Sequence, residues 1–170
     1  MTEPLAHFAA ASHRALKSDP GPLGRRQVCD LLAELLINQG FIAAHIPEDG
    51  PQREILYEDA ELGFCIVAHV YAEAKQSSPH DHGPSWAIYG QATGETLMTD
   101  WEKLEPATEA APGKARALRS YVLKPGMLHL YNEGELHSPS RAGPTRLLRI
   151  EGMNLDRVKR LKYVALETAH

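Results

Sequence analysis

The sequence predicts a mainly β protein in which two or three N-terminal α-helices precede a closed or sandwiched β-barrel. Three observations predict this fold class. Apolar residues recur at helical spacing only in the first 50 residues. Beyond Pro47 to Pro51 the chain breaks into short β-branched and aromatic runs bounded by Gly, Pro, Asn or Asp, a pattern typical of all-β architectures. The length of 170 residues suits a single domain that buries about 70% of its unfolded surface.

Residues 1–50 form the expected helical segment, packed on a barrel that occupies residues 51–170. Two stripes of residues at helical spacing predict the first two helices: Leu5, Phe8, Ala9, Ser12 and Leu16, and then Val28, Leu31, Leu32, Leu35 and Leu36. The run Asp19-Pro20-Gly21-Pro22 separates the two helices, and Gly40 is expected to end the second.

The strands are expected, in chain order, at 53–58, 63–72, 86–91, 95–103, 116–124, 127–131, 135–139, 145–151 and 162–166. Between the fourth and fifth of these, residues 105–114 include Pro106, Pro112 and Gly113. That composition predicts an exposed loop.

Composition excludes several classes of protein. The 18 Lys and Arg against 22 Asp and Glu give a net charge of -4, and the one short basic run, at 157–162, is expected to be a solvated face rather than a nucleic-acid site. No apolar stretch approaches the ~20 residues of a membrane helix. Cys29 and Cys65 fall in a predicted helix and a predicted strand, which predicts buried thiols rather than a disulfide. We therefore expect a cytoplasmic monomer or homodimer without nucleic-acid or membrane partners.

The motif S-S-P-H-D-H-G at 77–83 carries the clearest chemistry. Side chains two apart point the same way only on a strand, so His80 and His82 are expected on one strand, with Asp81 opposite as a loop-fixing carboxylate. A third imidazole, His137, follows about 55 residues later, a separation counted along the chain. Three imidazoles suit a catalytic metal with open coordination positions. The alternative is that the H-x-H pair alone arose by chance. His129 is the alternative third ligand.

Turn signals then place these histidines in a wider pattern. Lys124-Pro125-Gly126 and Asn132-Glu133-Gly134 bracket a short strand before His137. The chain here resembles the cupins, whose first motif carries H-x-H and whose second carries P-x-G and a further histidine. Its S-P-H-D-H at 78–82 and L-H-S-P at 136–139 most resemble the cysteine dioxygenase type I family of thiol dioxygenases, over roughly residues 57–151.

The resemblance implies a cupin double-stranded β-helix, or jelly-roll barrel. It also implies a non-haem Fe(II) dioxygenase in which His80, His82 and His137 hold iron and three positions remain for substrate and dioxygen. No carboxylate follows at 84–87, where the general cupin pattern has its glutamate ligand, and this favours the three-histidine set. Ligand type alone also permits Zn, Ni or Mn.

The residues around the implied metal depart from the family. Asp59 stands where animal members have a carboxylate-pairing arginine, Ala87 stands where some have a cross-linked cysteine, and Leu147, Arg149 and Glu151 replace the Ser-His-Tyr relay. Cysteine is therefore expected to be a poor substrate. Arg149 and Glu151 are expected to point inward, either as a structural ion pair or as a substrate anchor and a proton-handling group.

A shift of one residue in the strand at 145–151 would instead turn Arg146, Leu148 and Ile150 inward and leave both charges outside. His69, Tyr71, Trp86 and Tyr89 are candidates for lining the substrate pocket, with burial in the core as the alternative for each. The sequence thus predicts a metal-dependent cupin oxygenase acting on a small molecule and dioxygen. The alternatives are a cupin isomerase, lyase or ring-cleaving dioxygenase with another divalent metal, and a non-catalytic small-molecule-binding cupin.

Overall fold

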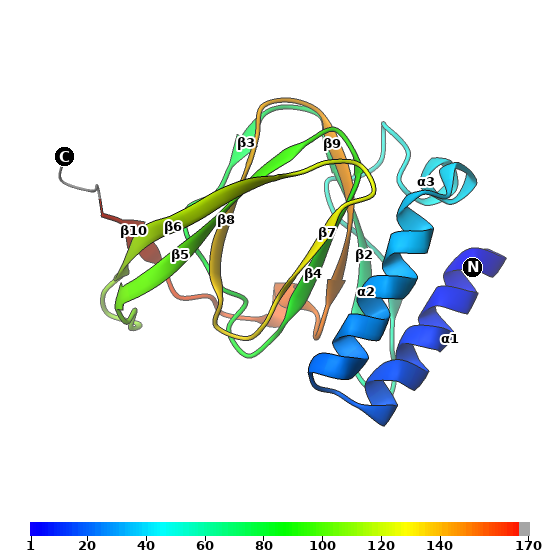
Figure 1. Ribbon diagram of the computed structural model, residues 1–170, viewed down its shortest axis with the longest axis horizontal. Coiled ribbons are helices and arrows are strands. Elements are labelled where there is room, and N and C mark those ends of the chain that lie inside the picture. Colours follow the sequence, from blue (N-terminus) through cyan, green and yellow to red (C-terminus); the bar gives the residue numbers. More distant parts are fainter. Residues whose placement is uncertain (167–170) are drawn as a thin grey trace.

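The computed structural model describes residues 1–166, which form three helices and two facing β-sheets (Figure 1). The helices are α1 (Glu3–Ser18), α2 (Pro22–Leu36) and α3 (Gln39–His45). The strands are β1 (Glu54–Glu58), β2 (Cys65–Tyr71), β3 (Lys75–Gln76), β4 (Ala87–Thr93), β5 (Thr96–Glu105), β6 (Gly113–Leu123), β7 (Leu128–Tyr131), β8 (Leu136–Arg141), β9 (Thr145–Glu151) and β10 (Tyr163–Ala165). A 3₁₀ turn, η1 (Leu155–Arg157), follows β9.

Each sheet has five strands, in the orders β1-β2-β9-β4-β7 and β10-β6-β5-β8-β3. All pairs are antiparallel except β10 with β6. From β6 onward the chain alternates between the sheets, with β7 and β9 in one and β8 in the other. This crossing pattern is that of a jelly-roll double-stranded β-helix, so the predicted fold class is confirmed.

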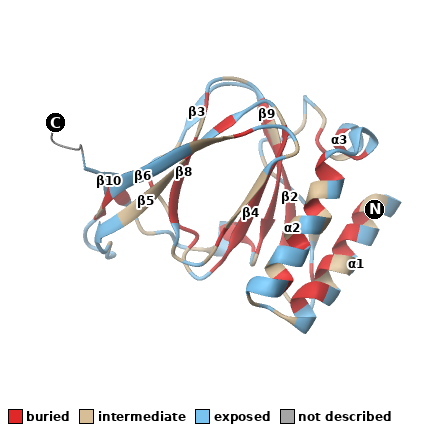
Figure 2. Cartoon of the chain, viewed as in Figure 1, coloured by how far each residue is buried: buried red, intermediate tan, exposed pale blue. Residues whose placement is uncertain are grey.

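The helices cover the outer face of the β1-β2-β9-β4-β7 sheet. In Figure 2 the buried sides of α1 and α2 are turned toward the sheet. The outward apolar side chains of β2, β4 and β9 share one cluster with the helix stripes; they are Ile66, Ala68, Val70, Ile88, Leu148 and Ile150. Fully burying such a side chain contributes about 1.5–3 kcal/mol, so this layer holds the helices on the barrel.

Helix boundaries differ from the prediction at one point, since Gly40 does not end the second helix. Helix α2 ends at Leu36, and the Oδ1 atom of Asn38 then accepts a hydrogen bond from the Phe41 N–H at 2.9 Å. An asparagine cap of this kind begins a new helix, which places Gly40 in the first turn of α3.

The nine predicted strands are all present, with shifts at their ends, and the expected loop at 105–114 shortens to the segment between Glu105 and Gly113. No helix in the described part of the chain is long and apolar enough to cross a membrane. The two cysteines are not bonded to each other, and burial raises the pKa of each thiol to about 11. Both thiols are therefore protonated and unreactive near neutral pH.

The two faces of strand β9 separate the core from the barrel interior. Leu148 and Ile150 belong to the helix-facing cluster, whereas Leu147 packs with Tyr89 and Met98 inside the barrel. Because side chains alternate along a strand, Arg149 and Glu151 share the inner face with Leu147. The alternative phase, with Arg146, Leu148 and Ile150 inward, is therefore wrong.

Candidate metal centre

Three histidines meet inside the barrel. His80, His82 and His137 each offer a ring nitrogen, and these nitrogens lie within 4.8 Å of one another. The His137 ring centroid lies 4.7 Å from that of His80 and 4.7 Å from that of His82. Residues that are 55 positions apart in the sequence thus form one cluster of donors suited to a divalent metal.

The prediction that His80 and His82 lie on one regular strand is wrong. Strand β3 ends at Gln76, and His80 makes only an isolated bridge to His137, with N–H···O distances of 3.0 Å in both directions. Three residues lie between Gln76 and His80, but only two lie between their partners Ser140 and His137. The extra residue falls beside Pro79, which has no N–H to donate to the ladder. His82 therefore lies in the loop that follows.

Hydrogen bonds orient two of the three rings. His80 Nδ1 lies 2.9 Å from the Ser78 carbonyl oxygen, and His137 Nδ1 lies 3.1 Å from that of Glu135. Both Nδ1–H groups therefore donate to the backbone, which leaves each Nε2 lone pair free for a metal. The ring of Tyr131 stacks on His137 at 3.8 Å between centroids and fixes its plane.

The three histidines suit a metal in their protonation state as well as in their positions. Burial lowers the pKa of all three imidazoles, so each is neutral at physiological pH, the form that binds metals. His82 is 1% exposed, and its Nδ1 has no hydrogen-bond partner among residues 1–166. A buried ring nitrogen without a partner is unfavourable unless something binds the ring.

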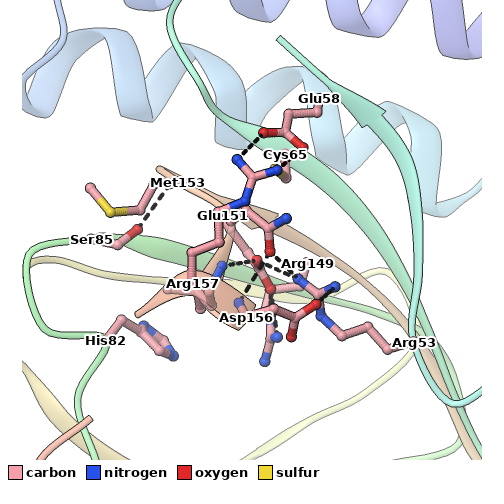
Figure 3. Close-up of polar contacts among 12 residues, drawn as sticks. Arg53, Glu58, Cys65, His82, Ser85, Arg149, Glu151, Met153, Asp156 and Arg157 are labelled. Atoms are coloured by element: carbon pink, nitrogen blue, oxygen red, sulfur yellow. Dashed lines mark hydrogen bonds and ion pairs between the residues drawn. The ribbon is translucent and has the colours of Figure 1, made fainter. Parts of the chain in front are cut away.

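Asp81 holds the histidine loop in place, as expected of it. One of its carboxylate oxygens accepts the Gly83 N–H at 3.0 Å, and the other pairs with Lys103 Nζ at 2.8 Å. Gly83 has φ +60°, a conformation that side chains rarely adopt, which explains a glycine directly after the second histidine. Further on, the Ser85 hydroxyl accepts the Met153 N–H at 3.2 Å (Figure 3).

Two predicted candidates lie elsewhere. His129 is on the inner side of β7 but packs its ring between Tyr121 and Tyr131, and it is not among the clustered donors. Trp86 does not line the site, because its indole belongs to the helix-facing cluster with Ile88. Trp86 and Ile88 have even numbers and Tyr89 an odd one. Because side chains alternate along a strand, Trp86 and Ile88 lie on one face of the sheet and Tyr89 on the other.

A cavity of about 350 Å³ opens beside the histidines. Its lining includes predicted residues and several that the sequence did not suggest; the residues are Gln52, Arg53, His69, Tyr71, Lys75, Ser77, Ser78, His80, Tyr89, Pro139, Arg141, Arg149, Asp156 and Arg160. Five of these are Lys or Arg and one is Asp. The cavity is therefore strongly cationic, although the whole chain is acidic.

Tyr89 links the histidines to this cavity. Its hydroxyl oxygen lies 3.1 Å from His82 Nε2 and 3.3 Å from His137 Nε2, and Arg149 donates a hydrogen bond to the same oxygen at 3.4 Å. His69 and Tyr71 lie further along the wall, with His69 Nδ1 3.3 Å from the Tyr71 hydroxyl. Burial and the neighbouring arginines lower the pKa of His69 well below its usual value, so it is neutral.

Arg149 and Glu151 form an ion pair at 2.5 Å between Nη2 and Oε1 (Figure 3). Glu151 is fully buried, and its other oxygen accepts from Arg53 Nη2 at 2.9 Å and from the Leu155 N–H at 3.0 Å. Burial alone would lower the pKa of Arg149, while Tyr89 and Glu151 raise it. The carboxylate is thus held between two guanidinium groups, an arrangement typical of a structural pair.

Arg141, Arg160 and Lys75 were not singled out from the sequence. Arg160 belongs to the basic run expected to be a solvated face, and it is exposed and also lines the cavity. For Arg141 a signal existed, because it follows His137 by four residues on one strand, a spacing that keeps both on the inner face.

No protein-family model matches the chain, and no curated protein matches it. The similar solved structures include cupins. A cupin superfamily protein from Desulfitobacterium hafniense is 13% identical, with a TM-score of 0.43, over 63% of this chain and 81% of that one. KdgF from a Halomonas species is 15% identical, with a TM-score of 0.43, over 58% and 74%. An oxalate oxidase is 15% identical, with a TM-score of 0.46, over 68% and 57%.

Proposed function

We propose that this protein is a metal-dependent cupin oxygenase, a non-haem Fe(II) dioxygenase that resembles the thiol dioxygenases but has a rebuilt substrate pocket. One observation carries the proposal: three neutral imidazoles, with no carboxylate among them, form one cluster of donors, and one of them, His80, lines a cavity of about 350 Å³. A site with three protein ligands retains open positions and is typical of catalytic rather than structural metals. The cavity has the volume of a small-molecule site.

His80, His82 and His137 are the residues that would hold the metal. Ferrous iron, when bound, supplies the redox chemistry that dioxygen requires, together with open coordination positions for both reactants. The chain itself then has to orient the substrate and place its polar groups. Among the polar side chains of the cavity, Tyr89 is well placed for this role, because its hydroxyl lies within hydrogen-bond distance of His82 and His137.

Arg149 orients Tyr89 and stays charged through its pair with Glu151. Of the two roles expected for this pair, the contacts favour the structural one, since both Glu151 oxygens are already engaged by arginines. Protonation of Glu151 would leave the buried Arg149 guanidinium without its counter-ion and Arg53 with Asp156 alone, which is strongly unfavourable. A proton donor or acceptor at the site is therefore better sought in Tyr89 or in neutral His69.

The proposal is tested by metal analysis and oxygen uptake. Protein purified without a histidine tag is expected to contain about one equivalent of metal per chain for its three ligands and to consume oxygen with a small thiol. The panel is cysteine, 3-mercaptopropionate and cysteamine. Cysteine should be a poor substrate compared with a thiol of different charge, because Asp59 stands at the position of the family arginine and is bound to His13 at 2.9 Å.

Rapid turnover of cysteine would contradict the substrate assignment. Full metal content without uptake on any thiol would contradict thiol oxygenation and favour a cupin isomerase, lyase or ring-cleaving dioxygenase. Protein that remains folded and binds small molecules without metal would favour a binding cupin.

A further inference from the structure

The inner wall of the barrel carries two buried arginines in different electrostatic situations. Arg149 is neutralised by Glu151. Arg141 is 4% exposed, its side chain forms no hydrogen bond or ion pair with any group in residues 1–166, and its Nε is a buried donor without an acceptor. A buried charge without a counter-ion costs several kcal/mol, so a folded protein rarely retains one without a function.

The surroundings of Arg141 make the imbalance larger. Its guanidinium lies over the Tyr71 ring at 4.2 Å, and Lys75 Nζ approaches the same ring at 5.1 Å. Lys75 is also the cross-strand partner of Arg141 in the β3–β8 pair, where like charges repel. Burial lowers the pKa of Arg141, as expected for a guanidinium with no anion beside it.

We infer that Arg141, seated on Tyr71 and flanked by Lys75, is the binding site for the carboxylate group of a small substrate. The inference rests on the proposed function, because it names the substrate class of the same cavity. Tyr71 covers one face of the guanidinium, and Arg141 lines the cavity. A guanidinium offers a planar fork of N–H donors. That fork matches a carboxylate bidentately.

Strand β8 relates this anion site to the histidines. His137, Pro139 and Arg141 alternate onto the inner face, and both Pro139 and Arg141 line the cavity. Four residues of strand span about 13 Å between the backbone positions of His137 and Arg141. The substrate is therefore a molecule with its reacting group near His137 and its carboxylate at the other end of the cavity.

Binding under anaerobic conditions tests the inference without any turnover. The protein as purified is titrated calorimetrically with 3-mercaptopropionate and with 2-mercaptoethanol, which share the thiol but differ in the carboxylate. The wild type is expected to bind the carboxylate probe about 10- to 100-fold more tightly, the usual value of a charge-assisted hydrogen bond. Arg141→Met should abolish this preference, and Arg141→Lys should restore part of it.

Arg116→Met is the matched control. It removes one positive charge from an exposed pair with Glu102, outside the cavity, and should keep the full preference. Arg141→Met should also melt no lower than the wild type, because it removes an uncompensated buried charge. An equal preference in wild type and Arg141→Met, a fall in melting temperature for that variant, or tighter binding of inorganic phosphate than of succinate would each overturn the inference.

These outcomes are separable from those of the proposed function. Carboxylate preference that depends on Arg141, without oxygen uptake, would support the anion site and contradict the oxygenase. Oxygen uptake that is equal for neutral and carboxylate thiols would do the reverse.

Discussion

The two faces of the β1-β2-β9-β4-β7 sheet are built from the same strands and differ in almost every respect. The outer face of β9 presents Leu148 and Ile150 to the helices, in a cluster without charges. The inner face presents Arg149 and Glu151 to the barrel, beside Tyr89 and the histidines. Alternation along one strand thus separates packing from chemistry within about 3 Å of chain. Substitutions of neighbouring residues should accordingly have effects of different kinds.

The largest effect is expected at the histidines. His82→Ala removes one of three ligands and should lower metal content from about one equivalent per chain to less than a tenth, because two imidazoles hold a divalent ion weakly. His129→Ala is the control, since His129 packs between two tyrosines outside the cluster. Metal analysis of both variants decides the matter, and retention of metal by His82→Ala would show that the cluster is not the site.

Glu151→Gln tests the inner face as a source of stability. The change removes the counter-ion of buried Arg149 and leaves Arg53 paired with Asp156 alone, and it should lower the free energy of unfolding by about 3–5 kcal/mol. Urea denaturation measures the loss. Exposed Glu102, which pairs with Arg116, serves as the control, and Glu102→Gln should change stability by less than about 1 kcal/mol. A loss below that value for Glu151→Gln would show that the buried network is relaxed by water.

Leu148→Ala tests the outer face. Leu148 is fully buried, and truncation should lower the free energy of unfolding by about 2–5 kcal/mol through lost burial and a cavity. Metal content of the folded variant should not change, since Leu148 points away from the histidines. If fully folded Leu148→Ala protein lost its metal, the packing of the outer face and the metal centre on the inner face would be coupled.

The smallest effect concerns Asp59, which joins the helical layer to the β1–β2 hairpin. Burial raises the pKa of Asp59. The hydrogen bonds from the Leu62 N–H at 2.7 Å, from His13 and from other donors lower it by more, so the net pKa lies below the usual range. A lowered carboxyl pKa stabilises the fold above the unfolded pKa of about 4, and this stabilisation is lost as pH falls through the folded pKa. Asp59→Asn should therefore cost about 1 kcal/mol at pH 7 and less near pH 2. Urea midpoints at both pH values measure this, and an equal loss at both would contradict it.

Periodicity explains why so much of the fold was predictable. The stripes that begin at Leu5 and Val28 form helices because their apolar faces have a sheet to cover, and the short runs beyond Pro51 form strands for the same reason. At two positions the structure differs from the prediction because of a single local residue. Asn38 begins a third helix where Gly40 was expected to end the second, and Pro79 interrupts the strand expected to carry His80 and His82.

The site was predictable in its ligands and less so in its pocket. His80, His82 and His137 do meet, as their motif suggested, whereas Trp86 faces the helices, which its parity relative to Tyr89 already implied. The positive charge of Lys75 beside buried Arg141 could not be predicted from the sequence, because it depends on the pairing of β3 with β8. A two-residue strand without a hydrophobic pattern leaves no such signal in the sequence.

The one-residue shift at Pro79 has a mechanical consequence. His137 belongs to a strand paired along its length, whereas His82 lies in a loop held by the His80–His137 bridge, by Asp81 and by the Ser85 contact with Met153. An ion held by both would act as a cross-link between segments about 55 residues apart, and its affinity would include the free energy of ordering that loop. Removal of the ion would release the loop at 77–86 before it disturbed the sheets, so hydrogen exchange there would report occupancy of the centre.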